Sequence, residues 1–121
     1  MAATNQFRLG VIHVTFADQY YTHQWSFETL MRKMSEVGPN MGVEMVAPMF
    51  NPDHPHVTPF FEVEFKQSCE RNGLVPTSYA IYSDHRGFYP NRDMTDDEAV
   101  DYMVCHIKST AKLGFPVMRA Q

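Results

Sequence analysis

Apolar runs and amphipathic stretches alternate along the chain, and this alternation is the main structural signal in the sequence. Apolar runs begin near Phe7, Gly42, Val75 and Phe115, and an amphipathic stretch follows each of the first three. Such regular alternation predicts parallel strands joined by crossover helices. The last apolar run, residues 115–121, ends the sequence with no helix to cover it. We therefore expect an α/β chain with four parallel strands that forms part of a larger domain.

The three amphipathic stretches carry start and stop signals for helices over residues 26–37, 58–73 and 95–114. Each begins at a Ser or Thr that can cap the helix, and each is closed by a Gly. The third has the clearest start, because Thr95 and Glu98 have the spacing of a capping box. Helical spacing predicts that the buried side chains are Phe27, Leu30, Met31, Met34, Phe61, Phe65, Cys69, Ala99, Met103, Ile107 and Ala111.

Strands are expected over residues 7–16, 43–48, 77–83 and 117–121, where Val, Ile, Met and Tyr are frequent. The connections after the first three strands, residues 17–25, 49–57 and 84–94, are long, whereas the turns that lead from helix to strand are short. Parallel α/β folds place their functional sites at the carboxyl ends of the strands. The long connections therefore indicate where a site would lie.

The spacing of the strands distinguishes between two α/β architectures. Successive strands begin about 33 to 41 residues apart, close to the ~30 residues per unit of a (β/α)8 barrel of ~250 residues. An open doubly wound sheet also needs only four or five strands, but it usually carries a phosphate-binding turn after its first strand. Residues 17–23, Ala-Asp-Gln-Tyr-Tyr-Thr-His, offer no such turn. We therefore expect residues 1–121 to form a single partial domain, half of a TIM barrel.

Composition excludes some partners. The chain has a net charge of −4 and a pI near 5.8, and none of its ten basic residues forms a run. Nucleic acids and anionic membrane surfaces require clustered Lys and Arg, so neither is expected as a partner. The sequence shows no signal peptide and no apolar stretch long enough to span a bilayer. With only two cysteines, both in expected helices, these features predict a cytoplasmic protein.

Three segments carry a resemblance to a known family. Residues 42–46 (Gly-Val-Glu-Met-Val), 73–76 (Gly-Leu-Val-Pro) and 111–119 (Ala-Lys-Leu-Gly-Phe-Pro-Val-Met-Arg) resemble the xylose-isomerase-like TIM barrels. Within that superfamily the chain is most similar to bacterial sugar phosphate isomerase/epimerases, a group that includes catalytic subunits of C-glycoside deglycosidases. The resemblance covers residues 7–121 and only the amino-terminal half of a family member.

The resemblance implies an enzyme in which a base removes a proton next to a sugar carbonyl. Members hold one divalent ion, Mn, Mg or Co, through Glu, Asp, His and Glu of the last four strands, and the ion stabilises the enediolate. Those strands are not in this sequence, so the metal ligands are expected outside the chain. The intact parent is thus expected to be a metal-dependent sugar phosphate isomerase or epimerase. The alternatives are the catalytic subunit of a C-glycoside deglycosidase acting on 3-oxo-glycosides, and a non-catalytic half-barrel that assembles with another chain.

Four residues on the expected strands are candidates for binding a sugar or glycoside. Glu44 lies within the second strand, where a carboxylate must be paired or lose stability. It either bonds a sugar hydroxyl or is satisfied by the backbone or by Arg119. Arg119 and Gln121 alternate on the fourth strand and so point the same way. His13, near the end of the first strand, is either a substrate ligand or a hydrogen-bonded core residue.

Residues in the connections supply further candidates. Asp84 follows the third strand, and the aromatic residues Tyr20, Tyr21 and Trp25 follow the first. The aromatic rings either stack on a sugar or a flat aglycone, or pack over the first helix. Asp53, His54 and His56 are metal-ligand types, but their spacing matches no established motif, so no metal site is predicted in this chain.

No nucleophilic constellation is predicted, because Cys69 and Cys105 are expected on helix faces remote from the strand ends. An isolated half-barrel would expose the apolar inner face of its sheet and two open edges. The expected partners are therefore a small-molecule sugar or glycoside and, as a protein partner, either a second copy of the chain or a second subunit.

Overall fold

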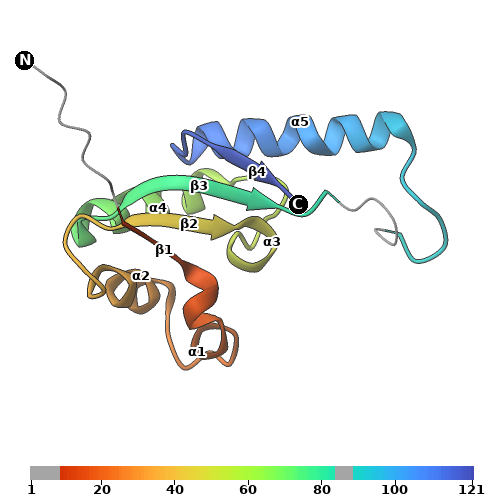
Figure 1. Ribbon diagram of the computed structural model, residues 1–121. Helices are drawn as coiled ribbons and strands as arrows, with labels where there is room; N and C mark the ends of the chain where they lie inside the picture. Colours follow the sequence, from red (N-terminus) through yellow and green to blue (C-terminus); the bar gives the residue numbers. More distant parts are fainter. Residues whose placement is uncertain (1–8, 84–88) are drawn as a thin grey trace, which may run out of the picture.

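The computed structural model describes residues 9–83 and 89–121. Within these residues one sheet is formed by β1 (Gly10–Ile12), β2 (Gly42–Val46), β3 (Val75–Ile81) and β4 (Met118–Ala120). The strands lie in chain order, and each neighbouring pair is parallel (Figure 1). The predicted α/β class with four parallel strands is confirmed.

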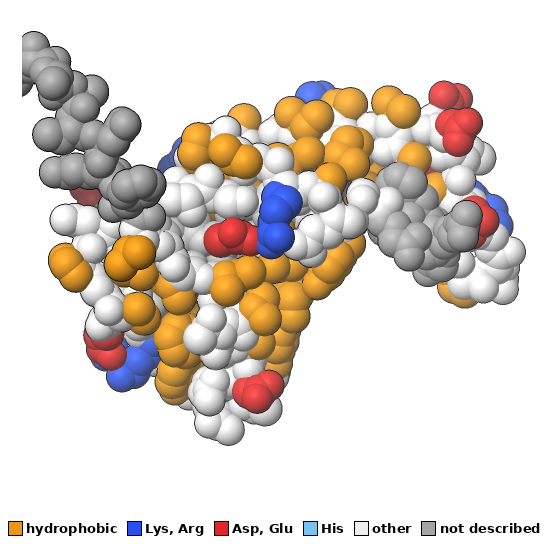
Figure 2. Space-filling view, viewed as in Figure 1, with side chains coloured by type: hydrophobic (Ala, Val, Ile, Leu, Met, Phe, Trp, Pro, Cys, Tyr) orange, Lys and Arg blue, Asp and Glu red, His pale blue; other side chains and the backbone are white. Residues whose placement is uncertain are grey.

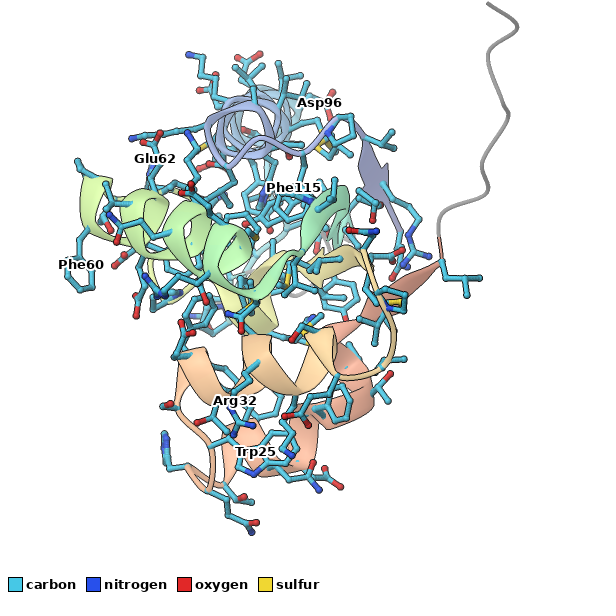
Figure 3. All side chains as sticks on the ribbon, turned by 90° about the vertical axis from the view of Figure 1, so that its left-hand side faces the viewer. Trp25, Arg32, Phe60, Glu62, Asp96 and Phe115 are labelled. Atoms are coloured by element: carbon cyan, nitrogen blue, oxygen red, sulfur yellow. The ribbon has the colours of Figure 1, made fainter. Side chains whose placement is uncertain are left out.

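The order of the strands determines which face of the sheet the helices cover. Each crossover moves one strand further in the same direction, and parallel crossovers are right-handed. The helices α2 (Phe27–Ser35), α4 (Pro59–Asn72) and α5 (Asp96–Lys112) therefore lie on one side of the sheet, as the side view shows (Figure 3). A doubly wound sheet would reverse direction and cover both faces. The arrangement is that expected of half a barrel.

The predicted helix starts are confirmed by their caps. The Ser26 hydroxyl accepts a hydrogen bond from the Thr29 N–H at 3.2 Å, and Thr58 caps α4 in the same way. Thr95 and Glu98 form the predicted capping box, with both reciprocal bonds present. Gly73, with φ 62°, ends α4 in the left-handed region that glycine adopts without strain.

The predicted first strand, residues 7–16, is too long. β1 ends at Ile12, residues His13–Phe16 form a 3-10 turn, and the expected connection 17–25 begins with the short helix α1 (Ala17–Tyr21). The reason lies at β2, where the Val46 N–H donates to Nδ1 of His13 at 3.3 Å. A side chain satisfies this backbone donor, so the first strand does not continue beside β2.

The second strand is also shorter than the predicted 43–48. β2 ends at Val46, and a second short helix, α3 (Ala47–Phe50), follows directly. Pro48 lies in its first turn, where a missing N–H costs no hydrogen bond. Two of the three long connections thus begin with helical turns at the carboxyl ends of their strands.

The core lies between the sheet and the helices. The predicted buried stripes of α2 and α4 are confirmed, and Phe27 packs at their margin. Phe115 points into the space between helices and sheet (Figure 3), with its ring centroid 5.2 Å from those of Phe65 and Tyr79. The fully buried side chains of this core are Leu30, Met31, Met34, Val43, Met45, Ala47, Phe50, Phe65, Tyr79, Ile81 and Leu113.

The predicted buried stripe of α5 is wrong for its second half: Ala99 and Met103 are partly buried, and Met103 packs against the core, but Ile107 and Ala111 face solvent. Ile107 is 53% exposed and Ala111 is exposed, whereas His106, Ser109 and Thr110 are buried. The helix is turned this way because Ser109 donates to the carbonyl oxygen of Pro55 at 2.7 Å. Polar contacts with the connection after β2 therefore decide which face of α5 turns inward.

An exposed apolar face remains on α5. Val100, Val104 and Ile107, exposed by 60%, 40% and 53%, follow one another at helical spacing. Hydrophobic side chains lie along this helix at the top of Figure 2. Among residues 9–83 and 89–121, no helix combines the length and apolar character needed to cross a membrane.

Candidate functional site

The face of the sheet opposite the helices carries the polar residues. Val43 and Met45 of β2 point into the core, so the alternating residues Glu44 and Val46 point to the opposite face. The strand register places Ser78 of β3 beside Glu44, and it places Ala80 between Val46 and Arg119 of β4. In the described part of the chain no helix covers this face. It is the surface that would face the interior of a closed barrel.

Three of the predicted site residues meet on this face. The Arg119 guanidinium donates from Nη2 to Oε1 of Glu44. In the amide orientation that satisfies both groups, the Gln121 side-chain oxygen accepts from Arg119 Nη1 at 2.7 Å and Nη2 at 2.8 Å. Glu44, Arg119 and Gln121 are called the polar triad below. Figure 2 shows an acidic and a basic side chain in contact near the centre of this face.

The polar triad stays accessible although its charges are paired. The side chains of Glu44 and Arg119 are 28% and 46% exposed. A guanidinium carries five N–H donors and a carboxylate has about four acceptor positions. Hydrogen bonds within the triad use three of these donors and one of these acceptor positions, so two donors and most of the acceptor capacity remain for a ligand. The triad therefore offers both donors and acceptors to a polyhydroxylated ligand.

His13 lies away from the polar triad. Its side chain is fully buried, with the ring centroid 5.3 Å from that of Phe50 and Nδ1 bonded to the Val46 N–H. Burial lowers the pKa of His13 to about 4, because the imidazolium loses its hydration. The ring is neutral at pH 7 and helps to shape the end of β1. Its predicted alternative role, a hydrogen-bonded core residue, agrees with this placement.

The predicted aromatic group divides in two. Trp25 packs against Phe16, with ring centroids 5.7 Å apart, and both lie against the core together with Tyr20. Tyr21 instead remains exposed, and its hydroxyl donates to the carbonyl oxygen of Met49 at 2.9 Å. Tyr82, which follows β3, brings its hydroxyl within 3.8 Å of the Met49 sulfur. The candidate Asp84, with His85 and Arg86, lies outside the described residues.

A second cluster joins the connection after β2 to α5. Nε2 of His54 lies 3.1 Å from the Tyr102 hydroxyl, and the His54 and His106 ring centroids are 4.7 Å apart. His106 is fully buried, and its pKa is lowered to about 4, first by burial and then by the neighbouring His54 and His56.

A Cys/His contact that the sequence did not predict lies beside this cluster, because Sγ of Cys105 is 3.3 Å from Nδ1 of His56. The two residues are 49 positions apart, and no sequence spacing signals such a contact. The pair borders a pocket of about 330 Å³ lined by Pro55, His56, Tyr89, Met94, Glu98, Asp101, Tyr102 and Cys105.

The described residues do not fit a divalent metal ion. Across residues 9–83 and 89–121, no group of three or more His, Cys, Asp and Glu side chains is arranged to hold one. The polar triad contributes a single carboxylate, which is already paired with a guanidinium. No chemical step through a metal is derived from the residues of this chain.

Comparisons with known proteins point to one class of enzyme. No family model matches the chain. The chain is 31% identical over 112 residues to a C-glycoside deglycosidase alpha subunit of Microbacterium trichothecenolyticum, an alignment that covers 93% of this chain and 30% of that protein. It is 29% identical over 114 residues to a 3'-dehydrocarminate deglycosidase alpha subunit of Microbacterium sp., covering 94% and 32%.

A further C-glycoside deglycosidase alpha subunit, from Arthrobacter globiformis, is 31% identical over 113 residues, covering 93% of this chain and 30% of the relative. The chain thus spans about a third of the length of the curated relatives that it matches. Almost the whole chain is similar to one portion of these longer subunits.

Proposed function

We propose that this chain is part of the alpha subunit of a C-glycoside deglycosidase, an enzyme that separates an aromatic aglycone from a 3-oxo-glycoside by breaking a C–C bond. The observation that carries this proposal is the similarity of 93% of the chain to a protein of that name. The names of the relatives support this reading better than the sugar phosphate isomerase expected from the sequence.

The proposed reaction is an elimination that needs no oxidant. The carbonyl at C3 acidifies the hydrogen on C2, and a general base removes it as a proton. The resulting electron pair forms the C1=C2 double bond, and the bond from C1 to the aryl carbon breaks. The aryl carbon then takes up a proton, so the products are the free aglycone and an unsaturated 3-oxo sugar. The transition state gains negative charge at the carbonyl oxygen, where hydrogen-bond donors stabilise it.

We assign the polar triad to binding the sugar. The donors of Arg119 and Gln121 suit the carbonyl oxygen and the hydroxyls of a 3-oxo sugar, and Glu44 accepts from a hydroxyl. Because the Glu44 carboxylate is paired with Arg119, we assign it no role as the general base. The base and a divalent ion of the Mn, Mg or Co type are proposed to belong to residues outside this chain.

We also propose a second subunit as partner. The relatives are named alpha subunits, and in the described part of this chain the apolar face of α5 is exposed and no helix covers the inner face of the sheet. An exposed apolar patch of this kind favours burial against protein.

The test is release of an aglycone by the full-length protein together with its partner subunit. The substrate is a C-glucosyl flavone oxidised at the C3 hydroxyl, and the free flavone is measured by liquid chromatography. A pentose phosphate is assayed in parallel for aldose–ketose interconversion. Flavone release supports the proposal. Isomerisation of the sugar phosphate without flavone release would reject it and return the function to the isomerase class.

A further inference from the structure

We propose that Tyr21, Tyr82 and Met49 form an aglycone platform, a surface on which the planar aromatic part of a C-glycoside stacks beside the polar triad. This inference rests on the proposed function, which supplies an aromatic ligand. The inference goes beyond the proposed function by assigning a binding site to the aromatic aglycone, which the polar triad does not suit.

The aglycone platform is assembled from the carboxyl ends of three successive strands. Tyr21 ends α1 after β1, Met49 lies in α3 after β2, and Tyr82 directly follows β3. In parallel α/β folds this end of the sheet carries the binding site. Three segments far apart in sequence thus place two aromatic rings and one thioether together where a ligand is expected.

Met49 holds the two tyrosines in position. The Tyr21 hydroxyl donates to the Met49 carbonyl oxygen at 2.9 Å, and the Tyr82 hydroxyl lies 3.8 Å from the Met49 sulfur. With their hydroxyls engaged, the two side chains remain 44% and 47% exposed. Both rings therefore offer apolar surface with reduced rotational freedom, so a ligand that stacks on them loses less side-chain entropy.

The strand register places Tyr82 next to the polar triad. Ser78, Ala80 and Tyr82 alternate along β3 and beyond it, and Ala80 lies opposite Arg119. Beyond the end of β3, the Gln121 N–H donates to the carbonyl oxygen of Ile81, and the Ser83 N–H donates to the carbonyl oxygen of Gln121. Tyr82 is thus level with Gln121 at the outer end of the face that carries Glu44.

The order of these groups matches the order of groups in a C-glycoside. A sugar that bonds to the polar triad would direct its aglycone along the strands toward their carboxyl ends, where the tyrosines lie. In Figure 2, hydrophobic side chains lie below the acidic and basic groups at the centre, in the region where Figure 1 places α1 and the turn after β1. Aromatic rings prefer to stack offset or edge-to-face, and flat polyphenols match a tyrosine pair in this way.

An exposed aromatic residue elsewhere in the chain provides a matched control. Phe60, in the first turn of α4, is 78% exposed and projects outward on the helix side (Figure 3). It lies on the side of the sheet away from the polar triad. A generic loss of exposed aromatic surface would affect Phe60 and the tyrosines alike.

The experiment measures binding of 7-hydroxyflavone, an aglycone without sugar, to the full-length protein by calorimetry. We expect Tyr82→Leu and Tyr21→Leu each to weaken binding about tenfold, whereas Tyr82→Phe and Phe60→Leu leave it within about twofold of the parent. Methyl β-glucoside, which has no aromatic group, should bind the parent and Tyr82→Leu equally. The thermal unfolding midpoint of each variant is compared with that of the parent to check that the fold is kept.

Three outcomes would overturn the platform: no binding of 7-hydroxyflavone by the parent protein, unchanged affinity in both leucine variants, or an equal loss in Phe60→Leu. Because the measurement needs no bond cleavage, it separates the two proposals. Flavone binding through the tyrosines without aglycone release would reject the enzymatic function and keep the platform. Aglycone release with unchanged flavone affinity in the leucine variants would reject the platform and keep the enzymatic function.

Discussion

Arg119 on β4 donates to Glu44 on β2 across the full width of β3. The contact is possible because Ser78 and Ala80, the β3 residues beside these two positions, are small. A long guanidinium side chain therefore passes over the middle strand and reaches a carboxylate two strands away. The ion pair joins three strands on the face that the described helices leave open.

Replacement of Glu44 by Gln separates binding from folding. The variant keeps the size of the side chain but removes the charge that Arg119 faces. Because both side chains are partly exposed, we expect the free energy of unfolding to change by less than about 1 kcal/mol. The kcat/KM for aglycone release should fall by about tenfold or more, since a hydrogen bond to a charged group contributes about 1.5–3 kcal/mol.

The matched control for this variant is Glu36→Gln. Glu36 pairs with Arg32 at 2.6 Å and with Lys33 at 2.8 Å on the surface of α2, away from the open face. The Glu36→Gln variant should leave kcat/KM for aglycone release unchanged. Unchanged turnover in Glu44→Gln would end the assignment of the polar triad to the substrate.

Substitution of Gly42 by Ala tests the close contact of β2 and β3. A Cβ atom at this position would lie 2.6 Å from Cγ2 of Thr77. Overpacking of this kind costs about 1–3 kcal/mol, so the variant should unfold at lower urea concentration. The second substitution Thr77→Ser removes the methyl group and keeps the hydroxyl that donates to the Val43 carbonyl oxygen at 2.8 Å.

Most of the lost stability should return in the double variant Gly42→Ala/Thr77→Ser. Gly38→Ala is the control, because its Cβ would meet only the flexible side chain of Met41. If the double variant is as unstable as Gly42→Ala alone, the Thr77 methyl group is not the cause.

Acidification should destabilise the fold through its buried histidines. The pKa of His106 is about 4 in the folded chain, below the ordinary 6.5. The unfolded state therefore binds a proton first as the pH falls. The stability that neutral His106 provides is complete above pH 6.5 and is lost progressively toward pH 4. The difference of about 2.5 pKa units sets an upper limit of about 3 kcal/mol.

The variant His106→Gln has no proton to take up at this position. It should therefore show a shallower fall in the free energy of unfolding between pH 6.5 and 4, whatever its stability at pH 7. His23→Asn, at an exposed position, should keep the slope of the parent. Equal slopes in the parent and His106→Gln would contradict the prediction.

The isolated 121-residue chain should self-associate at micromolar concentration, because α5 exposes Val100, Val104 and Ile107 and no described helix covers the inner face of the sheet. Light scattering measures the mass. Substitution of Val104 and Ile107 by Lys should lower the extent of association, whereas Val37→Lys, at another exposed apolar position, should not. A stable monomer of the parent chain would refute the idea that these surfaces require a partner.

The helix boundaries could be predicted because their determinants are local. Thr95 and Glu98 satisfy each other's backbone within one turn, and Gly73 adopts a conformation that few other residues tolerate. The buried stripes of α2 and α4 could also be predicted, since the apolar residues of each helix recur at helical spacing and so define a single inward face. Arg119 was among the partners expected for Glu44, and the strand register brings these two side chains together.

Other features depend on contacts between distant segments. His13 ends β1 because its ring reaches Val46, and Ser109 turns α5 by bonding to Pro55. Tyr82 meets Met49 and Tyr21 only after three strand ends come together. None of these contacts leaves a periodic pattern in the sequence.

The amino-acid sequence by itself determined the alternation of strands and helices and the caps, because hydrogen bonds and apolar spacing within a few residues specify them. The parallel sheet followed from that alternation, since crossover helices join strands that run in the same direction. Only the tertiary structure decided which face of α5 is buried, where β1 ends, and which side chains share the open face. Those outcomes depend on packing and hydrogen bonding between residues 28 to 75 positions apart, and local patterns carry no information about them.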